Sequence, residues 1–379
     1  MTSAIIVKLH KRYPGSPGGF SLDLEFMAAS GFTILFGPSG AGKTTILDCV
    51  AGIVSPDSGR ITVGDRVLCD TSSAINLPTA KRHIGYVFQD LALFPHLTIL
   101  ENVEYGLNHL PRRQRRERSS SILGAFRVSA LAARKVSEIS GGERQRVALA
   151  RTLVTDPEAL LLDEPLAALD ASTKSKIISD LRAWNTAHRI PILYVTHSRE
   201  EVFALGERVI ALQGGRIIAE GTPHEVMEAP RWETVAQLAG FENIFDATVE
   251  SANPERGTMT CQLHTQRIEE QSKVPLNKES VQLETPLVRA EIGASLRIGI
   301  RAGDILLAVV SPIGLSARNV IEGHIIALEL RDVIISARIN CGVELEVHLT
   351  LAARDALNLV PGKWVWLIIK THSCHLMRS

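Results

Sequence analysis

Residues 37–44 read GPSGAGKT and place two glycines, a lysine and a threonine at the spacing G-x-x-x-x-G-K-T. Glycines without a Cβ let successive backbone N–H groups turn toward phosphate oxygens. Lys43 adds a mobile positive charge, and the hydroxyl of Thr44 can bind Mg²⁺. The residues expected to surround the phosphates are Gly37, Pro38, Ser39, Gly40, Ala41, Gly42, Lys43, Thr44 and Thr45. This stretch predicts a nucleoside triphosphate site.

Two carboxylates follow a continuous apolar run at residues 159–162, which is typical of a buried parallel strand. Asp163, at the end of that strand, can hold Mg²⁺ through hard oxygen contacts. Glu164 can orient and deprotonate a water molecule. An acidic pair after a strand can also be a solvated loop start, but in a chain with a phosphate loop we favour a metal and catalytic role.

Two more polar side chains stand at predicted strand ends. Gln89 follows the strand at 84–88, and His197 follows the strand at 192–196. Open α/β sheets bind ligands at the carboxyl ends of their strands. A histidine in such a place is usually structural, but here other strand ends already carry the predicted site.

A second anion-binding helix end is predicted at residues 140–143. Ser140 is a favourable N-cap, and Gly141, Gly142 and Glu143 follow it at the start of a helix whose first N–H groups are free to bind anions. Asp170 closes a tight turn shortly after the acidic pair. A capped helix alone is weak evidence, and its weight comes from the motifs around it.

The elements that must position these residues alternate between strands and helices. The phosphate loop lies between an apolar strand at 32–36 and a helix that ends at Gly52. An opening hairpin is predicted from strands at 4–9 and 20–26 joined by a loop at 14–19, and residues 98–136 are helical in composition. The predicted fold class is therefore α/β, a P-loop domain with a helical insertion.

The tail has another pattern. Near residues 241–244 the chain changes to period-two alternation, and a hairpin is expected over 335–349, followed by a short helix capped by Thr350 and a last strand at 364–370. An OB-like small β-barrel closes such an antiparallel set. Residues 236–297 are predicted as a linker and the start of this β-rich region.

Bulk composition excludes several classes of protein. The 379 residues carry no formal net charge, so general electrostatics favours neither nucleic acid nor an anionic membrane. The basic run at 112–118 is more typical of a solvated helix face. Five scattered cysteines argue against zinc and disulfides, and no stretch reaches the length of a membrane span.

Taken in order, these motifs resemble those of ABC-transporter ATPase subunits over residues 1–235. The resemblance implies that two subunits sandwich two ATP molecules with Mg²⁺, each phosphate loop facing Ser140 of the other chain. It assigns Gln89 to Mg²⁺ or water and to the membrane partner, Asp170 to the dimer seam and His197 to the γ-phosphate. It also places Tyr13 against adenine, with Phe20 as the competitor. Ile139 and Glu143 depart from the usual leucine and glutamine but spare the serine and glycine N–H groups.

The segment 315–320, Leu-Ser-Ala-Arg-Asn-Val, resembles the Ser-Ala-Arg-Asn motif of molybdate-binding Mop domains. The chain is thus similar to molybdenum-import ATP-binding proteins. The resemblance implies an oxyanion-binding or dimerisation domain at 298–379, in which Ser316 and Arg318 could bind molybdate or tungstate with Lys370. It also implies permease partners, an external oxyanion-binding protein and a position on the cytoplasmic face of the inner membrane. Three alternatives remain open: an importer for another cargo, a soluble ATPase that takes no part in transport, and a C-terminal domain that stores the oxyanion.

Overall fold

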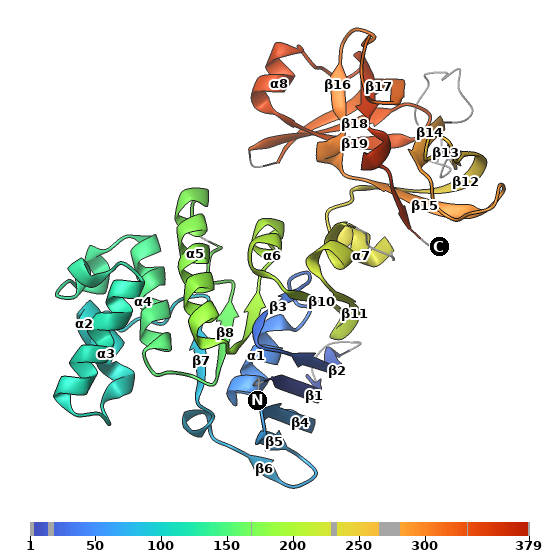
Figure 1. Cartoon of the computed structure of the whole chain (residues 1–379). Coiled ribbons are helices and arrows are strands. Elements are labelled where there is room, and N and C mark those ends of the chain that lie inside the picture. Colours follow the sequence, from blue (N-terminus) through green and yellow to red (C-terminus); the bar gives the residue numbers. More distant parts are fainter. Residues whose placement is uncertain are drawn as a thin grey trace. The chain divides into compact units, whose positions relative to one another are not determined.

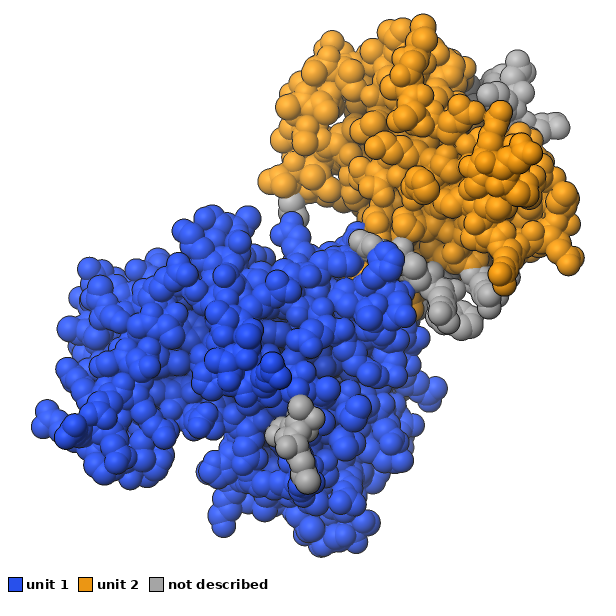
Figure 2. Space-filling view, viewed as in Figure 1, with its two compact units in different colours: residues 1–226 blue, residues 227–379 orange. Residues whose placement is uncertain are grey.

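A computed structural model describes residues 4–13, 19–167, 169–228, 233–264, 281–331 and 333–377. The chain forms two compact units, Met1–Val226 and Met227–Ser379 (Figure 2). Among the described residues, no helix is long and apolar enough to cross a membrane.

A six-stranded sheet forms the centre of the first unit, in the order β11-β10-β3-β9-β8-β7 (Figure 1). Its strands are β3 (Gly31–Phe36), β7 (Ile84–Val87), β8 (Ala159–Asp163), β9 (Pro191–Val195), β10 (Arg208–Gln213) and β11 (Arg216–Gly221). All neighbours are parallel except β10 and β11, which form an antiparallel hairpin. Every residue of β3, β8 and β9 is buried, as their apolar runs predict. The carboxyl ends of β3, β7, β8 and β9 therefore share one edge.

A second, antiparallel sheet packs in the same core. Its strands are β1 (Ile5–Arg12), β2 (Ser21–Ala28), β4 (Ser58–Val63), β5 (Arg66–Asp70) and β6 (Ile75–Asn76). The opening hairpin is confirmed, with Ile5 paired to Ala28 and Arg12 to Ser21. Helix α1 (Lys43–Ala51) buries Ile46 and Leu47 in a cluster that both sheets share. The helix that follows the phosphate loop is thereby held rigidly on two sides.

The helical insertion is also confirmed. The α-helices of the first unit after α1 are α2 (Ile99–Glu104), α3 (Arg112–Ala125), α4 (Gly141–Leu153), α5 (Ala171–His188) and α6 (Arg199–Leu205). Single helical turns add Thr79–Lys81, Tyr105–Leu107, Ser129–Leu131 and Val136–Glu138. The basic run forms part of an exposed face of α3, where Arg113 pairs with Glu117 at 2.9 Å. A buried ion pair of 2.8 Å between Arg146 and Asp180 ties α4 to α5.

The second unit has two five-stranded antiparallel sheets around one apolar core. One sheet has β12 (Asn243–Asn253), β13 (Thr258–Leu263), β14 (Val281–Pro286), β15 (Ser295–Ile300) and β21 (His375–Met377). The other has β16 (Leu306–Ala308), β17 (Asn319–Arg331), β18 (Ile334–Asn340), β19 (Glu344–Thr350) and β20 (Trp364–Ile369). Helical segments of this unit are α7 (Glu233–Leu238), Ala302–Asp304, α8 (Leu351–Ala356) and Thr371–Ser373, and the helical turn His224–Glu228 crosses the boundary between the two units in the chain.

Local predictions for the tail are confirmed. Strands β18 and β19 form the expected hairpin, with Ile335 opposite Leu349. Thr350 caps α8 by accepting a 3.1 Å hydrogen bond from the N–H of Ala353. Within 236–297, the segment predicted as a linker and the start of the β-rich region, strands β12, β13 and β14 belong to the second unit.

Candidate functional site

The phosphate loop leaves β3 and enters α1 through glycines in left-handed conformations. Gly40 has φ 79° and Gly42, the N-cap of α1, has φ 99°. A Cβ on Gly42 would lie 2.4 Å from Cδ2 of Leu22, so only glycine fits there. In the part of the chain that the structure describes, no atom beyond the chain neighbours of Gly40 lies within 4 Å of its Cβ position, which leaves space above the loop. The loop is an open cradle of the kind that binds phosphate through backbone N–H groups.

Lys43 is buried and bends back over this cradle. Its Nζ donates to the carbonyl oxygens of Gly37 and Pro38, at 2.8 and 2.9 Å. Burial lowers the pKa of the Lys43 ammonium, and the nearby carboxylates of Glu164 and Asp163 act in the opposite direction. A phosphate would give this partly desolvated cation a stronger acceptor than two carbonyl groups.

Thr44 and Asp163 meet beside the cradle and fit a Mg²⁺ ion. The Thr44 hydroxyl donates to Oδ2 of Asp163 at 2.8 Å. Two neighbouring ligands of an octahedral Mg²⁺ with bonds of about 2.0–2.1 Å lie about 2.9 Å apart. Burial raises the pKa of the Asp163 carboxyl, and the Thr44 hydrogen bond offsets part of that rise. These two oxygens are spaced to share one cation.

Glu164 projects from the turn after β8 with an unusual backbone. Its φ is 43°, a left-handed value that is rare for a residue with a side chain. Its N–H donates to the carbonyl oxygen of Val195 at 3.0 Å, which anchors the turn to β9. Nδ1 of His197 lies 3.3 Å from Oε2 of Glu164. The strain and the contact bring two predicted catalytic groups together at one strand edge.

A cleft of 640 Å³ joins most of the predicted nucleotide residues. Its lining residues are Tyr13, Phe20, Ser39, Gly40, Gly42, Lys43, Thr44, Thr45, Gln89, Asp163 and Glu164. The rings of Tyr13 and Phe20 lie 6.3 Å apart, and Tyr13 is 39% exposed. Both aromatic side chains therefore remain candidates for stacking on a base. His197 does not line the cleft but contacts Glu164, which does.

The Ser140 motif and Asp170 lie elsewhere in the first unit. Ser140 caps α4 as predicted, and the Ser140 N–H donates a 2.8 Å hydrogen bond to Oε2 of Glu143. Asp170 caps α5 by accepting from the N–H of Thr173 at 3.0 Å. A Cβ on Gly142 would lie 2.6 Å from Cγ2 of Thr173, so the two helix starts are neighbours. None of these residues lines the cleft of 640 Å³.

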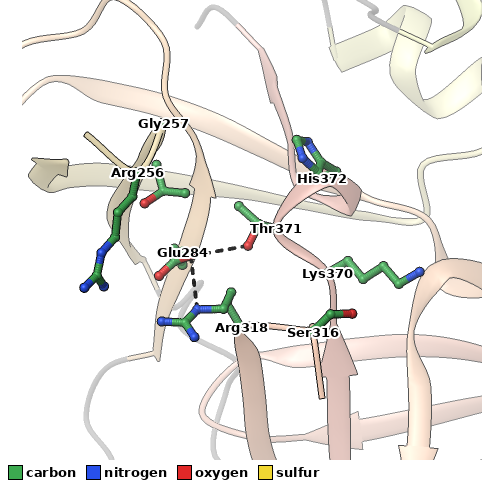
Figure 3. A pocket seen from close by; sticks show the side chains of 9 residues that line it. Arg256, Gly257, Glu284, Ser316, Arg318, Lys370, Thr371 and His372 are labelled. Atoms are coloured by element: carbon green, nitrogen blue, oxygen red, sulfur yellow. Dashed lines mark hydrogen bonds and ion pairs between the residues drawn. The ribbon is translucent and has the colours of Figure 1, made fainter. Parts of the chain in front are cut away.

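A separate pocket of 870 Å³ in the second unit unites the predicted oxyanion residues (Figure 3). Ser316, Arg318 and Lys370 line it. Sequence patterns missed the others with polar side chains, which are Arg256, Thr258, Glu284, Thr371 and His372. Arg256 and Glu284 lie in the segment 236–297, where no motif pointed to them. Only the pairing of β12 with β13 and of β13 with β14 brings them here.

Fold and cleft together define a P-loop nucleoside triphosphatase domain followed by a β domain. The ABC transporter family matches residues 22–167, and the TOBE domain family matches residues 315–376. The molybdenum import ATP-binding protein ModC of Rhizobium etli is 36% identical over 356 residues, 93% of this chain and 96% of that protein. The molybdate/tungstate import ATP-binding protein WtpC of Pyrococcus abyssi is 35% identical over 341 residues, 89% and 90% of the two chains. The chain belongs to the molybdenum import ATP-binding proteins of the ABC transporter family, which confirms the resemblance seen in its motifs.

Solved structures agree with this assignment for the first unit. A dimeric bacterial ABC transporter cassette matches with a TM-score of 0.52 and 31% identity, covering 58% of this chain and 98% of that one. A post-hydrolysis ATP-binding cassette with ADP and Pi matches with a TM-score of 0.51 and 31% identity, over 58% and 98%. The predicted α/β fold class is thus confirmed, and the TOBE match confirms the second domain.

Proposed function

We propose that this chain is the ATP-hydrolysing subunit of an importer for molybdate or tungstate, bound to its permease at the cytoplasmic face of the inner membrane. In this proposal residues 1–235 form the ATPase domain. The observation that carries it is the convergence of Lys43, Thr44, Asp163 and Glu164 on one cleft. The names of the relatives from Rhizobium etli and Pyrococcus abyssi supply the cargo.

The residues divide the work of hydrolysis by position. Lys43 and the loop N–H groups bind the outer phosphates, and Tyr13 stacks on the adenine. Glu164 orients a water molecule and accepts its proton, while His197 contacts the γ-phosphate beside it. Gln89, at the end of β7, contacts the water and senses the permease. Mg²⁺, when bound by Thr44, Asp163 and Gln89, supplies charge neutralisation, which together with positioning dominates phosphoryl transfer.

Two copies of the chain complete each site. Ser140 and the N–H groups after it form a capped helix start suited to binding an anion, but they do not line the cleft of their own chain. In the proposed dimer they cover the γ-phosphate bound by the other subunit, with Asp170 at the seam. The test uses Glu164→Gln, which should bind ATP without hydrolysing it. Adding Ser140→Arg to this variant should leave ATP binding to the monomer intact and abolish ATP-dependent dimerisation. Light scattering that still shows an ATP-induced dimer would contradict the proposal. Activity recovered by mixing Lys43→Ala and Ser140→Arg chains would support it.

The 870 Å³ pocket is proposed to bind the oxyanion itself, which makes the second domain regulatory. Arg256, Arg318 and Lys370 supply positive charge, and Ser316 and Thr371 supply hydroxyls, which is the chemistry of tetrahedral anion sites. Calorimetry on the full chain with molybdate tests this. Ser316→Ala or Arg318→Ala should weaken binding by about 1.5–3 kcal/mol for each charge-assisted hydrogen bond lost. A domain that only dimerises would show no heat.

A reconstitution experiment identifies the cargo. The chain should be purified with its permease in lipid vesicles, and ATPase activity measured with each oxyanion-loaded binding protein. Stimulation by molybdate or tungstate, and not by sulfate, is expected. Stimulation by another cargo would retain the ATPase assignment and overturn the molybdate assignment, while full activity with no permease would favour the soluble alternative.

A further inference from the structure

Among the residues that the structure describes, the pocket that gathers basic side chains in the second unit is also lined by one carboxylate. The carboxylate belongs to Glu284 on β14. The basic residues that line the pocket are Arg256, Arg318, Lys370 and His372. Figure 3 shows the Glu284 side chain directed toward Arg318 and Thr371. A carboxylate within a predicted anion site opposes the charge that the site is built to attract.

Glu284 contacts the same groups that an oxyanion would need. Its Oε1 lies 3.6 Å from Nε of Arg318 and accepts a long 3.5 Å hydrogen bond from the hydroxyl of Thr371. Both contacts are longer than strong hydrogen bonds, and the Arg318 side chain is 57% exposed. Contacts of this kind contribute little free energy, so another anion can replace them at small cost.

The backbone under Glu284 is fixed, in contrast to its side chain. The N–H of Glu284 donates to Oδ1 of Asn319 at 2.7 Å, and Nδ2 of Asn319 donates back to the Glu284 carbonyl at 2.9 Å. Asn319 is only 5% exposed. Strand β14 is therefore pinned to the start of β17, and any adjustment at the pocket must come from rotation of the carboxylate.

We propose that the Glu284 carboxylate is an internal competitor that occupies the anion position, and that a dianion binds by displacing it from Arg318 and Thr371. This inference rests on the proposed oxyanion pocket. A fully deprotonated tetrahedral dianion has no proton to donate to the carboxylate, so the two cannot share these partners. Glu284 thereby weakens the site and determines which anions it accepts.

The experiment uses the full chain without nucleotide and sodium molybdate as the probe. Glu284→Gln removes the negative charge and keeps nearly the same shape. It should tighten molybdate binding in calorimetry by roughly tenfold, since a like charge beside a bound anion is strongly unfavourable. Glu322→Gln on β17 is the matched control, because Glu322 is exposed and does not line the pocket. Thermal unfolding of each variant checks that it is folded.

The outcomes separate this inference from the proposed function. Displacement is supported if Glu284→Gln binds molybdate more tightly than the wild type, while Glu322→Gln does not. Adding Arg318→Ala to Glu284→Gln should then abolish this gain in affinity. If the wild type binds molybdate and Glu284→Gln binds it equally well or more weakly, Glu284 is not a competitor, although the pocket remains an anion site. No binding by either folded protein overturns the pocket as well. Inorganic phosphate is the second probe, because it keeps a proton at neutral pH and can donate it to a carboxylate. If the wild type binds phosphate and Glu284→Gln does not, the Glu284 carboxylate accepts a hydrogen bond from the bound anion and does not compete with it.

Discussion

The hydroxyl of Thr44 donates a 2.8 Å hydrogen bond to Oδ2 of Asp163, although 119 positions separate the two residues. Thr44 lies in the first turn of α1, which follows β3, and Asp163 ends β8, so the parallel sheet brings their oxygens to one edge. The contact holds both groups at the spacing that a shared Mg²⁺ ion requires.

Asp163→Asn should remove the Mg²⁺-dependent part of ATP affinity. The amide keeps an acceptor for Thr44 but loses the charge that binds the cation, so affinity for ATP with Mg²⁺ should fall by about 10- to 100-fold. Thr44→Ser keeps a hydroxyl and serves as the control. Titration of a fluorescent ATP analogue with and without Mg²⁺ measures the effect. Equal Mg²⁺ dependence in wild type and Asp163→Asn would refute the metal role.

The same substitution should stabilise the nucleotide-free protein at neutral pH. Burial raises the pKa of the folded Asp163 carboxyl above the ordinary 3.8, so ionisation costs more in the folded than in the unfolded chain. That penalty is complete above the raised pKa and disappears below pH 3.8. The melting temperature of Asp163→Asn, measured by calorimetry without Mg²⁺, should exceed that of wild type at pH 7 and approach it as the pH falls below 3.8. A lower melting temperature at pH 7 would contradict this account.

Glu164→Gln should retain ATP binding and lose turnover. A glutamine keeps the size and can hold the water, but it cannot accept the proton, and general base catalysis contributes typically 10²–10⁴-fold. Binding and hydrolysis are measured separately, on the same preparation. Lys43→Ala is the contrasting variant, since it should weaken binding itself. An unchanged hydrolysis rate in Glu164→Gln would exclude Glu164 as the base.

Glu143→Gln should lower the ATP concentration needed for half-maximal activity. Ser140 Oγ donates to Oε2 of Glu143 at 2.8 Å, and hydrogen bonds from the Ser140 N–H and hydroxyl lower the pKa of that carboxyl. The glutamine removes a negative charge beside the helix end that is proposed to bind phosphate and can still cap it. Glu143→Ala removes the charge and the cap together, and separates the two effects. Steady-state ATPase titrations that show a higher ATP requirement in Glu143→Gln would disprove this prediction.

Thiol reagents should not label the folded protein quickly at pH 8. All five cysteines are free and buried, and burial raises the pKa of Cys49 and of Cys374 to about 12. Reaction with a thiol reagent should show five groups only after denaturation, because the thiolate is the reactive form. Ser120→Cys on the exposed face of α3 is the positive control. Rapid labelling of the wild type would contradict this burial.

The sequence by itself predicted the nucleotide-binding site. The phosphate loop is local, because Gly37, Lys43 and Thr44 fall within eight consecutive positions. Asp163 and Glu164 could be added because parallel strands end at one edge, whatever their order in the sheet. The capping role of Ser140 is equally local, since a cap and its partner are three residues apart.

Only the tertiary structure decided which groups face each other in the second unit. The pocket with Glu284 and Arg318 depends on the register of β14 and on the buried Asn319 that pins it, and no pattern within a strand encodes either. The left-handed Glu164, anchored on Val195 of another strand, is equally a product of contact between strands. Spacing determines local conformation, whereas opposition of charges across a pocket depends on how distant strands pair and pack.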